Sequence, residues 1–205
     1  MIPFVFWAPV ALIAFVAPVA TGELDVGAAA GLAVAGAALW TLAEYSIHRW
    51  LLHITGGPVR LRLNWLIHGV HHQIPADPHQ AVFPPWVAIP FSAASLALAL
   101  ALLPWPEALC GYAGYTVSYL FSDWTHYATH HREPRTFVGR TARDRHLIHH
   151  FVDPTRGIGI ATGLWDHLFR TVAAPLGDDT SIDGLLARSE GSCDTSDRPE
   201  LMGYR

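Results

Sequence analysis

The sequence predicts an all-α integral membrane protein, in which four membrane-spanning helices form a bundle and a cytosolic helical cap gathers the histidines. Three observations support this fold class. Of the 205 residues, 51% are hydrophobic and only 15% are charged, whereas a soluble domain carries about 25% charged residues. Apolar runs long enough to cross a bilayer alternate with short polar turns. Ten of the 13 histidines fall in four clusters, each at or just past the end of an apolar run.

The length is that of one domain. We expect residues 1–175 to form the membrane domain, and residues 176–205, which are polar and acidic, to be disordered. The net charge of −4 with neutral histidines gives no sign of a nucleic-acid partner. No disulfide framework is implied, because Cys110 lies in an apolar run and Cys193 in the polar tail.

The first predicted span covers about residues 4–20. It resembles a signal peptide, since residues 17–20 are similar to a cleavage site. A positively charged start is missing, however, and Pro3, Pro9 and Pro18 interrupt the run. These features favour a retained membrane helix.

The second predicted span covers about residues 26–52, after a polar turn at residues 21–25. Small residues at 28–31 and 36–38 would let a neighbouring helix approach closely. The span exceeds the ~20 residues that a bilayer requires, so its end should project from the membrane. The later predicted elements are a surface helix at 60–73, spans at about 86–103 and 108–130, a soluble helix at about 141–151, and a short segment at 158–169.

Arginine predicts the orientation of the spans. The turns at residues 21–25 and 104–107 contain no arginine, and the chain contains no lysine. Ten arginines lie on the histidine side: Arg49, Arg60, Arg62, Arg132, Arg135, Arg140, Arg143, Arg145, Arg156 and Arg170. By the positive-inside rule the histidine side is cytoplasmic. Four spans then put both termini, and all four histidine clusters, on the cytoplasmic face.

The spacing within the histidine clusters is typical of metal ligands on helices. The clusters are His48 with His53; His68 with His71 and His72; His126 with His130; and His146 with His149 and His150. Each residue turns a helix by about 100°, so histidines at i, i+3 and i+4 share one face. His48 and His53 would be about 140° apart on a regular helix. They converge on one site only if the helix ends or bends between them, or they serve two metals.

Ten imidazoles exceed the four to six ligands that one ion takes, which favours two metals with about five histidines each. The fold class is therefore a membrane bundle whose cap holds a histidine-rich dimetal site. By ligand type alone, iron, zinc, copper or nickel would fit. Three histidines fall outside the repeated pattern and are expected not to be ligands: His79, His131 and His167.

Two carboxylates lie one helical turn before a clustered histidine. Glu44 precedes His48, and Asp123 precedes His126. Either carboxylate could hold the second nitrogen of a ligand imidazole, a common arrangement around metals. We therefore expect Asp123 to support the metal site without binding metal itself, and Glu44 to do the same or to be an ordinary solvated carboxylate at the end of a span.

These stretches resemble the fatty acid hydroxylase/sterol desaturase superfamily, and within it the fatty acid 2-hydroxylases that act on sphingolipid (ceramide) acyl chains. The resemblance covers about residues 43–171. The matching stretches are 44–53, 68–72 with Pro75 and Asp77, 82–85, 123–127 with His130, 146–151, and 157–169. The resemblance implies a four-span bundle, a cytosolic cap around a dimetal centre, and O2-dependent hydroxylation. It implies as metal ligands His48, His53, His68, His71, His72, His126, His130, His146, His149 and His150.

The chemistry implied by this resemblance narrows the metal. Oxygen insertion into a C–H bond requires a redox-active ion, and zinc is redox-inert, so we expect two iron ions, with zinc a substitute in a purified sample. O2 would be the co-substrate, and a lipid acyl chain, hydroxylated at the 2-position, the substrate. No His-Pro-Gly-Gly run occurs, so we expect a separate electron donor, cytochrome b5-like or a ferredoxin with its reductase. Gln80 stands where relatives often have arginine, which leaves headgroup recognition open.

Two other functions are compatible with the histidine pattern. A carotenoid ring hydroxylase shares the four-cluster plan, but the stretches at residues 83–85 and 165–166 favour the acyl hydroxylase. A non-catalytic membrane protein that binds or transports metal is the alternative from another class. Against it, the first three apolar runs carry no histidine or acidic residue at mid-span to mark an ion path.

Overall fold

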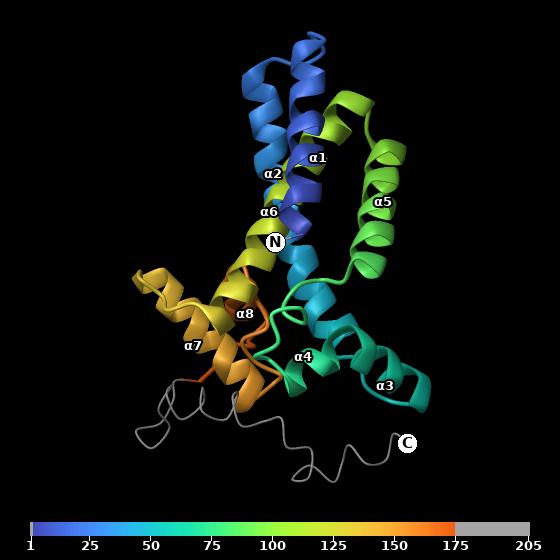
Figure 1. The fold of residues 1–205 in the computed structure, drawn as a ribbon. Helices are drawn as coiled ribbons and strands as arrows, with labels where there is room; N and C mark the ends of the chain where they lie inside the picture. Colours follow the sequence, from blue (N-terminus) through green and yellow to red (C-terminus); the bar gives the residue numbers. More distant parts are fainter. Residues whose placement is uncertain (1, 175–205) are drawn as a thin grey trace.

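The computed structural model describes residues 2–174, and within that range the chain forms helices and connecting segments without a strand. The upper part of Figure 1 is built from four long helices: α1 (Ile2–Ala20), α2 (Val26–Ser46), α5 (Pro85–Leu102) and α6 (Trp105–His131). The cap below them contains η1 (Ile47–Leu52), α3 (Pro58–Asn64), η2 (Trp65–Gly69), α4 (Val70–Gln73), α7 (Phe137–Phe151) and α8 (Leu164–Leu168). The predicted all-α class is thus confirmed for the described part, whereas the predicted disordered tail lies outside it.

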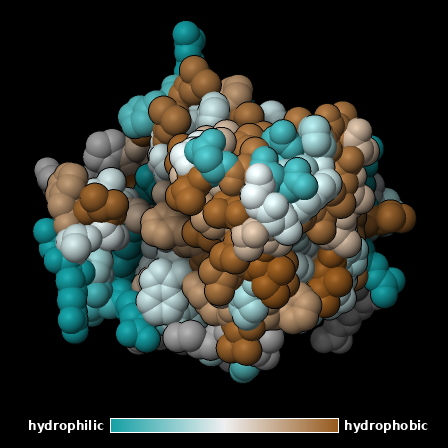
Figure 2. All heavy atoms as spheres, turned by 90° about the horizontal axis from the view of Figure 1, so that it is seen from above, coloured by the Kyte–Doolittle hydropathy of each residue, from teal (hydrophilic) through white to brown (hydrophobic). Residues whose placement is uncertain are grey.

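Three helices are long and apolar enough to cross a membrane: Pro3–Ala20, Val26–Leu52 and Pro85–Leu102. Large apolar side chains on them face outward, and Leu12, Val34 and Leu98 are each at least 60% exposed. Outward apolar side chains would be costly in water but suit a lipid solvent. Figure 2 looks down on the end of the bundle and shows hydrophobic side chains over much of this face, with small hydrophilic patches.

The fourth long helix, α6, is more polar than the three apolar candidates. It packs against α1, α2 and α5, and its polar side chains, such as Thr116, Ser122 and Asp123, are buried. Polar groups of this kind lower the mean hydropathy of a helix without facing the bilayer. The predicted fourth span therefore stays a prediction, although α6 occupies the middle of the bundle in Figure 1.

Backbone contact joins α2 to α6. A Cβ atom on Gly36 would lie 1.8 Å from the carbonyl oxygen of Gly111, and one on Gly114 would lie 1.7 Å from that of Ala33. Neither distance is compatible with a side chain, so glycine is required at both positions. The prediction that small residues in the second span let a neighbour approach closely is confirmed.

Several element boundaries differ from the predicted ones. The helix predicted at residues 141–151 begins at Phe137, because the Thr136 hydroxyl accepts a hydrogen bond from the Gly139 amide and caps the first turn. The predicted surface helix at 60–73 consists of three pieces, α3, η2 and α4. In the segment predicted at 158–169, only Leu164–Leu168 is helical.

Candidate metal centre

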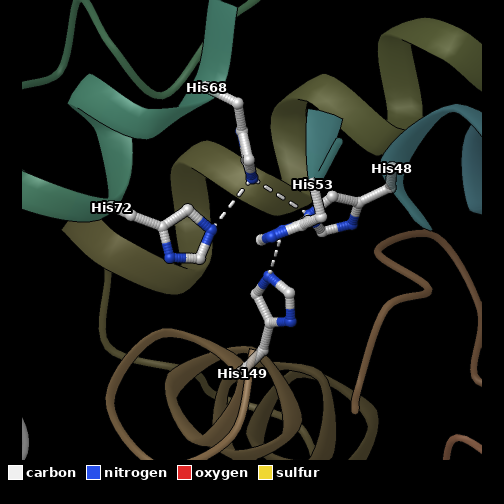
Figure 3. A group of neighbouring side chains, drawn as sticks. All are labelled: His48, His53, His68, His72 and His149. Carbon is white, nitrogen blue, oxygen red and sulfur yellow. Dashed lines mark hydrogen bonds between the residues drawn. The ribbon is translucent and has the colours of Figure 1, made fainter. Parts of the chain in front are cut away.

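The ten clustered histidines come together as two groups of five. The first histidine group is His48, His53, His68, His72 and His149; the second histidine group is His71, His126, His130, His146 and His150. Within each group, one ring nitrogen from every member lies within 4.8 Å of the others. Figure 3 shows the first histidine group, with imidazoles from three separate parts of the chain pointing toward one centre. The prediction of about five histidines per site agrees with this arrangement.

The spacing of the ring nitrogens fits one ion in each group. In the first group, His68 Nε2 lies 3.1 Å from His48 Nε2 and 3.0 Å from His72 Nε2. In the second group, His71 Nε2 lies 2.7 Å from His126 and 3.1 Å from His150. A metal–imidazole bond of about 2.1 Å puts neighbouring ligand nitrogens about 3 Å apart, and opposite ones about 4.2 Å apart. An all-imidazole donor set suits iron or zinc.

A widened helical turn brings His48 and His53 into the same group. Residues Ile47–Leu52 form a π-helix, in which the His53 amide donates to the His48 carbonyl oxygen, five residues earlier, at 3.2 Å. Residues five apart lie nearly above one another in such a turn. The π-helix ends at Leu52, so a helix end lies between the two histidines, and His53, just past that end, shares one group with His48. The predicted alternative in which the helix ends between His48 and His53 agrees with this arrangement, although the π-helix itself was not predicted. The alternative in which the two serve different metals is wrong.

Each of the two clusters of three histidines contributes imidazoles to both histidine groups. His68 and His72 belong to the first histidine group and His71 to the second, while the cluster on α7 contributes His149 to the first. The predicted common helical face therefore lies between the two groups. The His72 and His150 rings stack across this boundary with centroids 4.1 Å apart, so the two groups adjoin.

Burial keeps the histidines of the cap neutral. Burial, with smaller effects from neighbouring imidazoles, lowers the pKa well below the usual range for His68, His71, His72, His146, His149 and His150. Burial also lowers the pKa of His53 to about 4. Only the neutral ring offers a lone pair to a metal, so these rings are in the ligating form at neutral pH.

The second ring nitrogens distinguish the two groups. In the first group, His48 Nδ1 donates to the Ile158 carbonyl oxygen at 2.6 Å, and His149 Nδ1 donates to that of Arg156 at 3.0 Å. These bonds leave Nε2 as the free acceptor of each ring. In the second group, the backbone of Ala81 bonds the His126 ring. Three buried Nδ1 atoms of that group have no hydrogen-bond partner within residues 2–174: those of His71, His146 and His150.

The two candidate supporting carboxylates do not touch a ligand imidazole, which corrects the prediction. The Glu44 oxygens accept from the amides of Ile160 at 2.8 Å and Ala161 at 2.9 Å. Asp123 accepts from the Phe83 amide at 3.3 Å. His48 uses the backbone carbonyl of Ile158 instead, in a loop more than a hundred residues away in the sequence from Glu44, and His126 uses the backbone of Ala81. The three histidines expected not to be ligands, His79, His131 and His167, are outside both groups.

An apolar cavity of about 60 Å³ adjoins the first histidine group. Its walls come from α2, η1, α5 and α6, and include the aromatic rings of Trp40 and Tyr115. Near the cap it is bounded by Leu52 and Ile67, which directly precede His53 and His68 in the chain. A hydrocarbon chain in this cavity would therefore end beside the first group.

Known proteins resemble this chain over most of its described length. The family model described as fatty acid hydroxylase matches residues 33–171. "Ceramide very long chain fatty acid hydroxylase scs7" of Schizosaccharomyces pombe is 33% identical over 142 residues, which cover 67% of this chain and 41% of the relative. "Fatty acid 2-hydroxylase" of Rattus norvegicus is 37% identical over 151 residues, covering 69% and 39%.

A plant relative and a solved structure agree with these matches. "Dihydroceramide fatty acyl 2-hydroxylase FAH2" of Arabidopsis thaliana is 39% identical over 147 residues, covering 69% of this chain and 61% of the relative. The structure "Full length scs7p (only hydroxylase domain visible)" superposes with a TM-score of 0.77 at 32% identity, covering 87% of this chain and 67% of that one. The chain thus spans 39% to 61% of the length of these curated relatives.

Proposed function

The chain belongs to the fatty acid hydroxylase family, and on that premise we propose that it is a membrane-bound, O2-dependent di-iron hydroxylase that acts at the 2-position of a lipid acyl chain. The observation that carries the proposal is the pair of histidine groups, each with five convergent ring nitrogens, beside an apolar cavity. The names of the relatives, which refer to ceramide and fatty acyl hydroxylases, support the same substrate class.

The ten histidines would hold two iron ions, five ligands to each. Bound iron would supply the O2 activation and C–H hydroxylation that protein side chains cannot carry out. Overall, one acyl C–H bond, one O2 molecule, two electrons and two protons give one alcohol and one water. We propose that a cytochrome b5-like protein, or a ferredoxin with its reductase, delivers the electrons.

The residues of the chain itself would bind the substrate and exclude water. The aromatic wall formed by Trp40, Tyr115 and Tyr119 would bury the hydrocarbon chain. Leu52 and Ile67 would contact the acyl chain near its polar end, which would put the reacting carbon beside His53 and His68. Because α5 packs mainly on α6, the side of the cavity toward the bilayer offers a lateral entry for a lipid.

We further propose that α6 is the fourth membrane span. Its 27 residues would extend about 40 Å, which exceeds the hydrocarbon thickness of about 30 Å. Both ends of the membrane domain and the metal centre would then lie on the cytoplasmic side, as the arginine distribution favours.

Expression of the chain in a host that lacks 2-hydroxylated lipids tests this function. We expect acyl chains that carry one added oxygen atom, assigned to carbon 2 by fragmentation in a mass spectrometer. The product should depend on O2, and purified protein should contain two iron ions per chain. Oxygen added to carotenoids instead, or bound metal with no O2 consumption when reductant is supplied, would contradict the proposal.

A further inference from the structure

One short segment holds the second ring nitrogens of two first-group histidines. This brace segment, residues 156–161, connects α7 to α8 and offers the Ile158 carbonyl to His48 and the Arg156 carbonyl to His149. Both acceptors are backbone atoms, so their positions depend on whatever fixes the segment.

Three charged side chains from three different helices fix the brace segment. Asp166 on α8 accepts from the amides of Ile158 and Gly159, each at 2.9 Å. Glu44 on α2 accepts from the next two amides, and Arg145 on α7 donates to the carbonyls of Gly159 at 3.0 Å and Ile160 at 3.2 Å. Glu44 and Asp166 are only 5% and 1% exposed. Every backbone polar group from the Ile158 amide to the Ala161 amide therefore has a partner.

The packing around the brace segment leaves little room for another conformation. Gly157 has a φ of +64°, and a Cβ atom there would lie 2.7 Å from the Arg145 carbonyl oxygen. A Cβ atom on Gly159 would lie 2.1 Å from the Thr162 carbonyl oxygen. Buried charges are costly unless they are fully paired. Two buried carboxylates accept hydrogen bonds from backbone amides here, which indicates that the conformation of the brace segment is important for the site.

The second histidine group has a backbone partner for one ring, His126, at Ala81, and no braced segment that holds two of its rings. Its three buried Nδ1 atoms without partners, on His71, His146 and His150, contact no backbone carbonyl in the described part of the chain. None of the three charged side chains that fix the brace segment reaches a ring of this group through a hydrogen bond.

We propose that Glu44, Arg145 and Asp166 are positioning residues for one metal ion only: through the brace segment they orient His48 and His149 toward the ion of the first histidine group. The ion of the second histidine group does not depend on them. This inference rests on the proposed dimetal centre. A carbonyl bond to Nδ1 sets the tautomer and the ring orientation, and loss of such a bond typically lowers metal affinity by about 10- to 100-fold.

Cobalt titration of the full chain in detergent tests the inference. Co²⁺ is a suitable probe, because its absorption spectrum reports the ligand geometry and its uptake can be counted per chain. His53→Ala and His130→Ala give reference spectra for protein that lacks one ligand of the first or the second group. We expect Glu44→Gln to weaken one of the two Co²⁺ sites by about 10- to 100-fold. The absorption spectrum that remains should match that of the His53→Ala protein.

Asp123→Asn is the matched control, since it also neutralises a buried carboxylate one turn before a clustered histidine. It should leave the first-group site unchanged. Thr171→Val is a milder variant that removes one hydrogen bond to Asp166, and it should weaken the same site to a smaller extent if Glu44→Gln does not fold.

Three results overturn the inference, and they have two different meanings. Equal weakening of both sites, or weakening of neither, in protein that binds two Co²⁺ ions would refute the positioning role alone. Wild-type protein that binds fewer than two ions would refute the dimetal centre, and the inference with it.

Discussion

The two histidine groups have the same composition but different surroundings. Each offers five imidazoles within reach of one ion. The first draws His48 and His53 from a widened turn and has two rings fixed by the brace segment, whereas three rings of the second lack a partner for Nδ1. The comparison teaches that the number of ligands does not define a metal site by itself. The orientation of each ring, set by groups behind it, decides how firmly the ion is held.

Removal of one ligand from either group should have the largest effect. We expect His149→Ala and His130→Ala each to reduce product to background, because the proposed reaction needs both ions. Each variant should still insert in the membrane and keep the ion of the other group. Metal content per chain and lipid mass spectrometry measure the two effects.

His167→Ala is the control for these variants, because His167 is exposed and lies outside both groups. It should keep full turnover. Normal product from the His149→Ala protein would refute the ligand assignment of the first histidine group.

A bulky side chain in the apolar cavity should separate substrate binding from metal binding. Ala88 lines the cavity beside the aromatic wall. Ala88→Phe should lower turnover by about tenfold while two ions stay bound, since the added ring would take space from the acyl chain and a loss of about 1.4 kcal/mol of binding free energy corresponds to tenfold. A variant that loses metal as well would show that the cavity and the first group are not independent.

Chelator treatment should distinguish the two groups by rate. Rings free to turn release an ion more readily, so the second-group ion should leave about tenfold faster than the first-group ion. Metal content followed over time, with the Co²⁺ spectrum of the remaining ion, measures the order. A single rate for both ions, or earlier loss from the first group, would contradict the comparison.

Low pH should destabilise the metal-free protein through both histidine groups to a similar extent, so this prediction distinguishes the two groups least. Burial lowers the pKa of the cap histidines in each group, and that of His53 to about 4. An unfolded histidine titrates near pH ~6.5, so below that pH the unfolded chain binds more protons than the folded one. The stability of metal-free protein should thus be full above pH ~6.5 and fall as the pH decreases toward the folded pKa values.

Thermal unfolding of the metal-free protein at several pH values measures this effect. The His53→Ala and His130→Ala proteins should both show a weaker dependence than wild type, by similar amounts. A pH-independent melting temperature between pH 7 and pH 4.5 would contradict the burial of neutral imidazoles.

Much of the site follows from spacing alone. Eight of the ten histidines recur at i+3 or i+4 intervals, His48 and His53 lie five residues apart, and ligand number then implies two ions. The membership of each group could not be predicted, because His68, His71 and His72 share a helical face whether they serve one ion or two. Contacts between separate segments make that choice.

Two other features lay beyond sequence reasoning for different reasons. The π-helix at Ile47–Leu52 is a choice between hydrogen-bond partners four and five residues apart, and residue type specifies that choice only weakly. The role of Glu44 depends on a loop 116 and 117 residues away. Proximity along the helix to His48 suggested a direct contact, but tertiary packing directs the carboxylate to backbone amides instead.

The length of the continuous helix from Val26 to Leu52 would also set the distance between the bilayer and the metal centre. Its 27 residues extend about 40 Å, and a hydrocarbon core of about 30 Å leaves the histidine end about 10 Å beyond the acyl region. The widened turn adds a ligand without interrupting this helix. The distance of the metal centre from the bilayer would therefore be set by helix length rather than by a flexible linker. In the proposed hydroxylase, oxidation at this depth would reach carbons next to a lipid headgroup and not those near the methyl end of the chain.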